Sequence, residues 1–93
     1  MKSEKSLENS FCNQVKKQGG LAIKFHSAFF TGMPDRLVFL PGGRFELVEL
    51  KAEGKKASPR QVLVHSQLER LGFKVWVVDS LETMNQFFKS IEQ

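Results

Sequence analysis

Three side chains that could carry out chemistry lie close together in the segment GMPDRLVFLPGGRFELVELKA, residues 32–52. Asp35 follows a Gly-Met-Pro bend, and Glu49 and Lys51 lie two positions apart in an otherwise apolar run. Two carboxylates that converge on one point can bind a hard divalent cation, and a lysine beside them can stabilise the developing charge of a phosphoryl transition state. The alternative is that all three residues belong to the solvated face of a small hairpin.

The surrounding pattern predicts that this segment is a β-hairpin. Its strands would cover residues 35–40 and 44–52, and the sequence PGG between them would form the turn. A three-residue turn sets a register that places Asp35 opposite Glu49, and period-two alternation places Lys51 on the same face as Glu49. Like charges that face each other destabilise an ordinary hairpin. The predicted pairing therefore favours a metal site over a solvated face.

A helix and a further strand are predicted before the hairpin. Apolar residues at helical spacing predict a helix over residues 5–18, and strict alternation predicts a half-buried strand over residues 21–27. Leu21, Ile23 and Phe25 would form the apolar face of that strand. The sequence SAFFTGMP then predicts a loop, because glycine and proline interrupt it.

A helix, a strand and a second helix are predicted after the hairpin. Ser58 would be the N-cap of a helix that ends before Gly72 and presents Val62, Leu63, His65, Leu68 and Leu71 to the core. The apolar sequence FKVWVVD, residues 73–79, predicts an interior strand that is covered on both faces. Asp79 or Ser80 would cap a last helix, whose stripe consists of Leu81, Met84, Phe87, Phe88 and Ile91.

The order αβββαβα predicts an α/β (α+β) fold with a mixed four-stranded sheet and flanking helices. The long connection from the third strand to the fourth predicts a right-handed crossover between parallel strands. With 93 residues, 41% of them apolar and 26% charged, the chain is expected to form one domain over residues 1–93. No apolar run approaches the roughly 18 residues that span a membrane, and the single cysteine, Cys12, is expected to be a buried apolar side chain in a reducing compartment.

Positive charge is concentrated directly after the hairpin. The net charge is +4, and the sequence KAEGKKASPR, residues 51–60, holds four cations and one acid. Such a run can simply be a solvated loop. Next to clustered acids, however, these cations suit a phosphate-bearing partner such as DNA.

At these residues the sequence resembles the PD-(D/E)XK nuclease superfamily, with Pro34-Asp35 as the first half of the motif and Glu49-Leu50-Lys51 as the second. More narrowly, it resembles the virus-type replication-repair nuclease (VRR-NUC) domain. That resemblance extends from about Glu8 to Ser80 and includes the stretches GG, GMPDRL, VELKA, SPRQ and LERLGFKVWVVDS.

The resemblance implies a restriction-endonuclease-like αβββαβ core, here followed by a C-terminal helix. It implies that Asp35, Glu49 and the carbonyl of Leu50 bind Mg²⁺ or Mn²⁺, and that Lys51 acts on the water or the phosphate. It also assigns Glu8 to the metal site and Gln61 to the active centre. DNA contacts are expected from the basic residues Lys55, Lys56, Arg60 and Arg36.

The function implied by this resemblance is that of a metal-dependent DNA endonuclease that cleaves branched DNA such as four-way (Holliday) junctions. A lone domain of this kind is expected to be a homodimer in the cytoplasm of a bacterial or phage-infected host cell. The alternatives are a repair nuclease that trims flaps and a nucleic-acid-binding module that does not cleave.

Several of these residues also have a simpler structural interpretation. Glu8 could be one acid among several on an exposed helix, and Gln61 is the expected capping-box partner of Ser58. His26 alternates away from the apolar side of its strand, which favours a surface or groove position. The aromatic residues Phe29 and Phe30 could pack in the core, line a dimer contact or stack on an unpaired base.

Overall fold

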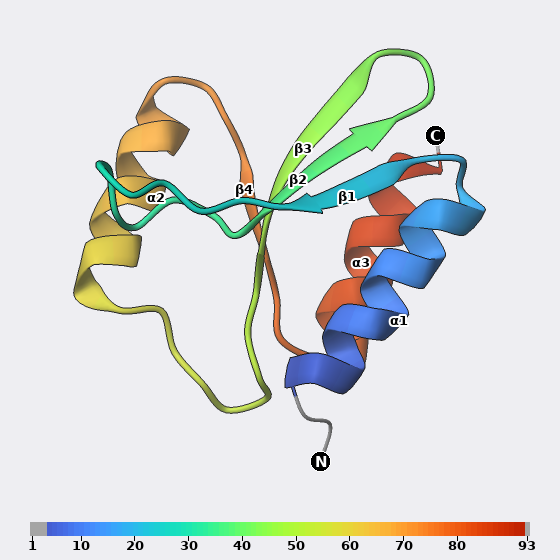
Figure 1. Ribbon diagram of the computed structural model, residues 1–93, viewed down its shortest axis with the longest axis horizontal. Coiled ribbons are helices and arrows are strands. Elements are labelled where there is room, and N and C mark those ends of the chain that lie inside the picture. Colours follow the sequence, from blue (N-terminus) through green and yellow to red (C-terminus); the bar gives the residue numbers. More distant parts are fainter. Residues whose placement is uncertain (1–3, 93) are drawn as a thin grey trace.

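The computed structural model describes residues 4–92, which form three helices and four strands in the predicted order (Figure 1). No helix within these residues is long and apolar enough to cross a membrane. The elements are α1 (Glu4–Lys17), β1 (Leu21–Lys24), β2 (Arg36–Leu40), β3 (Arg44–Leu50), α2 (Pro59–Arg70), β4 (Val75–Val78) and α3 (Leu81–Ile91).

The strands form one mixed sheet in the order β1-β2-β3-β4. β1 pairs antiparallel with β2, and β2 pairs antiparallel with β3. β3 and β4 run parallel, as the predicted crossover requires. The prediction that the last strand is interior is wrong, because β4 lies at the edge of the sheet. Its two apolar faces have different surroundings: Val78 is fully buried in the core, while Val77 on the other face is 40% exposed.

The hairpin of β2 and β3 has the register that the turn predicted. Leu40 pairs with Arg44 across the PGG turn, and the ladder continues to the pair of Arg36 and Val48. Gly42 and Gly43 both have positive φ values, of 82° and 76°, a conformation that favours glycine. Asp35 comes one residue before the paired part of β2 and therefore lies at the open end of the hairpin.

The hydrophobic core lies between one face of the sheet and the helices α1 and α3, which run side by side in Figure 1. Phe11 of α1 joins the two helices, since its ring centroid lies 5.3 Å from that of Phe87 and 5.4 Å from that of Phe88. Cys12 packs against this core but is only half-buried, so the expectation of full burial is wrong. The sheet contributes Val38, Leu40, Val48, Leu50 and Val78 to the core.

The second helix lies on the opposite side of the sheet and covers only part of it (Figure 1). Its buried residues are Val64 and His65. Val62, Leu63 and Leu71 had been predicted to belong to its buried stripe, but they are 57%, 47% and 73% exposed. The prediction failed because α2 meets the sheet only at β4 and at the end of β3 that carries Glu49, so much of its apolar surface has nothing to cover.

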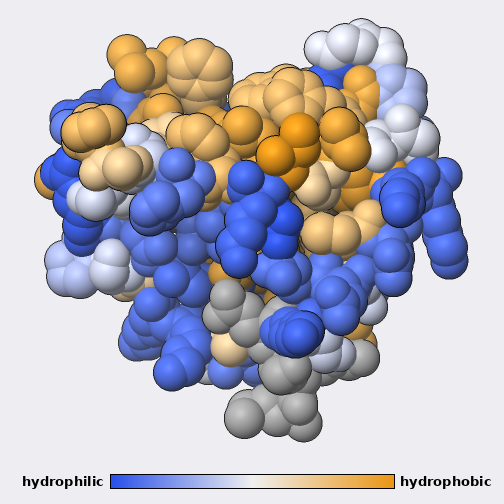
Figure 2. All heavy atoms as spheres, in the orientation of Figure 1, coloured by the Kyte–Doolittle hydropathy of each residue, from blue (hydrophilic) through white to orange (hydrophobic). Residues whose placement is uncertain are grey.

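The first strand is shorter than predicted and presents the other face to the core. It ends at Lys24, and its small residue Ala22 packs against the core, whereas Leu21 is 57% exposed and Ile23 is 42% exposed. The pairing explains this outcome, because Leu21 and Ile23 lie opposite Phe39 and Leu37 on the face turned away from α1. Figure 2 shows apolar side chains gathered along the upper part of the view, over the sheet next to the hairpin end and over α2.

Candidate active site

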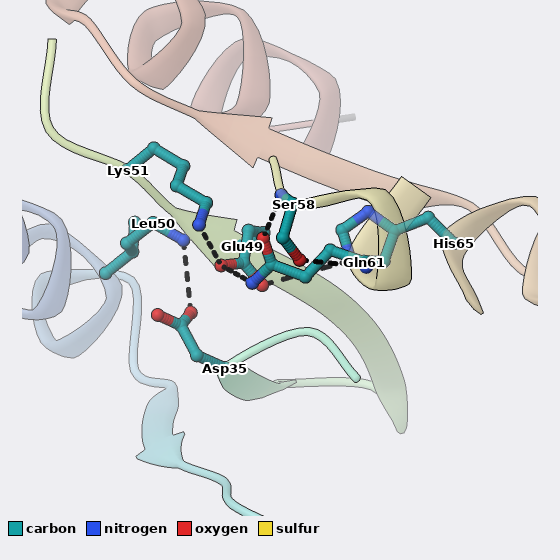
Figure 3. A network of polar contacts seen from close by, with 7 residues as sticks. All are labelled: Asp35, Glu49, Leu50, Lys51, Ser58, Gln61 and His65. Carbon is teal, nitrogen blue, oxygen red and sulfur yellow. Dashed lines mark hydrogen bonds and ion pairs between the residues drawn. The ribbon is translucent and has the colours of Figure 1, made fainter. Parts of the chain in front are cut away.

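The acids and the lysine of the hairpin line one cleft of about 310 Å³. Asp35 enters it from the start of β2, while Glu49 and Lys51 enter from the end of β3 (Figure 3). The opposite wall is the loop between β1 and β2, and Gln61 closes the side next to α2. The remaining lining residues are Phe25, His26, Ser27, Phe30, Thr31, Gly32, Met33 and Leu50.

The Glu49 carboxylate is the most buried charged group of the cleft, at 2% exposure. Its Oε2 atom accepts a hydrogen bond of 3.1 Å from Gln61 Nε2 and lies 3.5 Å from Lys51 Nζ. Burial raises the pKa of Glu49 to about 7, and the nearby charge of Asp35 adds to this rise while Lys51 opposes it. Glu49 therefore lies where its charge is costly unless cations gather around it.

Asp35 is held in the cleft by the backbone on both sides. Its Oδ1 atom accepts a hydrogen bond of 3.1 Å from the backbone N–H of Leu50, across the open end of the hairpin. Its own carbonyl oxygen accepts a bond of 2.8 Å from the N–H of Phe25, which closes the loop between β1 and β2. These contacts fix Asp35 beside Glu49 even though the regular strand pairing has already ended.

Gln61 combines the two roles that the sequence left open. Its backbone N–H donates to Ser58 Oγ and its side-chain Oε1 accepts from the Ser58 N–H, which completes a capping box at the start of α2. The other end of the same amide, Nε2, donates to Glu49. The helix cap thus orients the amide group that binds the Glu49 carboxylate (Figure 3).

His65 belongs to the same site and was not recognised in the sequence as a polar residue of the centre. It lies one helical turn after Gln61, is 9% exposed, and its Nε2 atom is 3.9 Å from Glu49 Oε1. That distance is too long for a hydrogen bond, and both atoms are buried without a hydrogen-bond partner among the described residues. Burial lowers the pKa of His65, and the charge of Lys51 acts in the same direction while that of Glu69 opposes it. The spacing of four residues between Gln61 and His65 could have indicated this position, because it places both side chains on one face of the helix.

Glu8 and Arg36 form an ion pair of 2.7 Å between α1 and β2. Glu8 is not one of the residues that line the cleft. The expected DNA contact of Arg36 stays a prediction, and in this structure the residue is 7% exposed and its guanidinium is paired with Glu8. The sequence could not indicate this, because the burial of Arg36 follows from α1 packing over its face of the sheet. The charges of both residues and of Asp35 also act on the Cys12 thiol, whose pKa is raised mainly by burial.

The cations predicted after the hairpin are on the surface near the cleft. Lys55 and Lys56 are exposed in the loop between β3 and α2. Arg60 is exposed as well, but its Nε donates to the carbonyl oxygen of Thr31 at 3.2 Å and its guanidinium lies 5.2 Å above the Phe30 ring. His26 lines the cleft, as a groove position requires.

Comparisons with known proteins identify the family to which the chain belongs. No family model matches the chain. A protein of Acyrthosiphon pisum secondary endosymbiont phage 1, named "Putative nuclease p44", is 47% identical over 77 residues, which is 83% of each chain. A solved VRR-NUC domain superimposes with a TM-score of 0.86 at 29% identity, over 95% of this chain and 96% of its own. The chain belongs to the VRR-NUC family of nucleases.

The VRR-NUC domain offers oxygen donors for a metal ion at the cleft. Asp35 and Glu49 supply carboxylates, and the Leu50 carbonyl lies between Glu49 and Lys51 in the chain. No group of three or more His, Cys, Asp and Glu side chains suited to a metal occurs in residues 4–92. Two carboxylates, a carbonyl and water nevertheless match the donors that Mg²⁺ accepts, because this ion usually keeps several waters.

The raised pKa of Glu49 predicts a pH-dependent loss of stability in the metal-free protein. The folded pKa of about 7 exceeds the ordinary value of 4.5, so the unfolded chain releases this proton first as the pH rises. Stability should therefore fall between those two pH values. Glu49→Gln removes the effect and should unfold on the order of 5 °C higher than wild type at pH 8, with little difference at pH 4.

This prediction is checked by thermal unfolding in EDTA at both pH values. The matched control is Glu53→Gln, which removes one charge from an exposed position of the neighbouring loop. A Glu49→Gln variant that is less stable than wild type at pH 8 would contradict the prediction. Such a result would mean that the ionised carboxylate gains more from Lys51 and Gln61 than it loses by burial.

Proposed function

We propose that this VRR-NUC domain is a Mg²⁺- or Mn²⁺-dependent endonuclease that hydrolyses phosphodiester bonds in DNA, with branched DNA such as four-way junctions as its preferred substrate. The observation that carries the proposal is the convergence of Asp35, Glu49 and Lys51 in one cleft. Two carboxylates and one ammonium group at the mouth of a small polar cleft match the requirements of phosphoryl transfer: a cation site and a donor for the phosphate.

The electrostatics of the cleft support a cation between the two acids. The charge of Asp35 adds to the rise in the pKa of Glu49, so it disfavours the ionised form of that carboxylate. Glu49 Oε1 is buried and accepts no hydrogen bond among residues 4–92. A divalent cation held by Asp35, Glu49 and the Leu50 carbonyl would neutralise this repulsion, polarise the phosphate and activate a water molecule.

The side chains around the acids would then orient the reactants. Lys51 Nζ lies 3.5 Å from Glu49 Oε2 and its side chain is 19% exposed, so the ammonium group can also reach a phosphate oxygen or the attacking water in the cleft. Gln61 Nε2 holds Glu49 Oε2 in place at 3.1 Å. We assign Glu8 to a supporting part, in which it holds Arg36 beside the hairpin end; direct contact with the metal would require breaking its 2.7 Å ion pair.

The surface around the cleft is suited to a DNA backbone. Lys55 and Lys56 are exposed in the loop that directly follows Lys51, and Arg60 is exposed at the start of α2. Together with the net charge of +4, these cations would bind phosphates on either side of the scissile bond. Such contacts hold the backbone without reading the base sequence, as a nuclease selective for DNA structure requires.

The test of the proposed function is cleavage of labelled four-way junction, flap and duplex DNA in Mg²⁺ or Mn²⁺, with and without EDTA. Wild type should cut the junction fastest, EDTA should abolish cutting, and Asp35→Ala should be inactive. Metal binding should also raise the unfolding midpoint of wild type, by on the order of 10 °C at 100 times the dissociation constant.

The outcomes of this test separate the alternatives. Preferential cutting of flaps would identify a flap-trimming nuclease. Binding of all three DNA structures without nicking in either metal would identify a non-cleaving binding module and reject the enzyme. Cleavage that persists in Asp35→Ala would reject the site.

Lys51→Met should abolish most turnover while metal binding survives. The substitution keeps the apolar stem of the side chain and removes its charge, and loss of one positioned donor to a transition state lowers rates by about 10² to 10³-fold. Single-turnover cleavage of a junction, together with Mn²⁺ titration by calorimetry at pH 8, measures both effects. Lys56→Met, which removes an exposed cation of the same loop, is the control and should weaken DNA binding only. Unchanged single-turnover cleavage in Lys51→Met would remove Lys51 from the mechanism.

We further propose that two copies of the chain associate through the uncovered face of the sheet. On this face Leu21, Phe39 and Phe45 lie in one cross-strand row, and they are 57%, 43% and 42% exposed. The Phe39 and Phe45 rings are in contact at a tilt of 54°, with their centroids 5.2 Å apart, and Ile23 extends the surface in the next row. Rows of large apolar residues exposed on a sheet usually mark an interface. A two-fold dimer would bring two equivalent clefts to one symmetric junction.

The proposed dimer predicts that Phe45→Glu is monomeric and folded. A charge in the middle of an apolar interface is buried without a partner on association, whereas in the monomer it remains in water. Light scattering gives the mass in solution, and the control Leu81→Glu places the same charge on an exposed residue of α3, on the other side of the sheet. A wild-type protein that is already monomeric at micromolar concentration would reject the dimer.

A further inference from the structure

The loop between β1 and β2 carries a fully exposed aromatic side chain next to a residue that lines the cleft. Phe29 has a relative exposure of 102%, compared with 47% for its neighbour Phe30. The loop ends at Asp35, whose carbonyl accepts a bond of 2.8 Å from the N–H of Phe25, so both ends of the loop are joined beside the proposed metal ligand. Phe29 therefore lies in a loop whose two ends meet at Asp35.

The loop is fastened to α2 by several contacts that hold its conformation. Arg60 Nε donates to the carbonyl oxygen of Thr31 at 3.2 Å and to its Oγ1 at 3.3 Å, and the Arg60 guanidinium lies 5.2 Å from the centre of the Phe30 ring. Gly32 has a φ of 91°, and a Cβ added there would lie 2.8 Å from Val64 Cγ2. Phe30, Thr31 and Gly32 are therefore held against α2, and the exposed Phe29 directly precedes this anchored segment.

Two spaces of different polarity meet at Phe30, the neighbour of Phe29, and together they suit a nucleotide. On one side of Phe30 is the polar cleft of about 310 Å³ with Asp35, Glu49 and Lys51. On the other side is an apolar groove of about 360 Å³, lined by Phe30 together with Val64, Leu68 and Leu71 of the second helix and its end. Phe30 lines both spaces, so a nucleotide whose phosphate enters the cleft has an apolar surface next to it for its base.

We propose that Phe29 stacks on an unpaired base next to the scissile phosphate, with Phe30 and Arg60 as its support. Every base has a π-face, so an aromatic platform of this kind binds bases without reading their sequence. The cations Arg60, Lys55 and Lys56 would hold the adjoining backbone. A base in a regular duplex is stacked on its neighbours, whereas a base at a branch point or in a flap is free to reach Phe29. The inference rests on the proposed function and gives a physical reason why this nuclease would prefer branched DNA.

The test measures binding without metal, so that it is independent of cleavage. A four-way junction and a matched duplex carry 2-aminopurine at the branch or at the same sequence position, and binding is followed by anisotropy and by 2-aminopurine fluorescence in EDTA. Phe29→Ala should weaken binding to the junction by about 10-fold or more and abolish the fluorescence change, while duplex binding stays within about two-fold. Phe29→Trp should restore both signals, because it retains a stacking surface.

Phe73→Ala is the matched control, since Phe73 is a 51% exposed phenylalanine that does not line the cleft. Equal junction affinity and an equal fluorescence change for wild type and Phe29→Ala would overturn the stacking role. A change of mass in Phe29→Ala would overturn it too, because it would place Phe29 in a protein contact. These results are distinguishable from failure of the proposed function, in which wild type binds DNA in EDTA but does not cut it in Mg²⁺ or Mn²⁺.

Discussion

The buried Glu49 carboxylate is the constraint on which the rest of the site depends. A carboxylate at 2% exposure is costly to ionise, and the raised pKa of about 7 records that cost. The contacts that reduce it come from different elements: Lys51 from the end of β3 and Gln61 from the first turn of α2. The carboxylate of Asp35 adds a second negative charge, although the Asp35 backbone opposes the rise in the Glu49 pKa, and among these contacts only Lys51 brings a full positive charge. This imbalance of charge is the physical basis of the proposed cation site.

The start of α2 connects this electrostatic problem with the local sequence. Ser58 and Gln61 form a capping box, which sets the rotamer of Gln61 so that its amide nitrogen is directed at Glu49. One turn later, His65 comes to lie 3.9 Å from the other oxygen of the same carboxylate. The helix therefore begins where it does for two reasons, since its cap satisfies its own first N–H groups and also orients the polar side chains of the centre.

Features that depend on neighbours in the sequence could be predicted, and features that depend on distant packing could not. The PGG turn predicted the hairpin register, and the pattern Ser58-x-x-Gln61 predicted the cap, because each is decided within a few residues. The exposed face of β1, the edge position of β4 and the burial of Arg36 depend on which helix covers which face of the sheet. Alternation alone cannot determine this, since both faces of the sheet are apolar. The roles of the site residues remain predictions.

One helix, α2, both covers part of the sheet and supplies side chains to the site. On the first face, α1 and α3 close the core completely, with Phe11, Phe87 and Phe88 in mutual contact. On the second face there is only α2, and its buried residues are Val64 and His65. A helix placed over the middle of this face would cover Phe39 and Phe45 but would carry Gln61 away from Glu49. In the structure α2 lies beside the Glu49 carboxylate instead, and the row of Leu21, Phe39 and Phe45 remains exposed. The part of this face that α2 does not cover carries Phe39 and Phe45, which are 43% and 42% exposed.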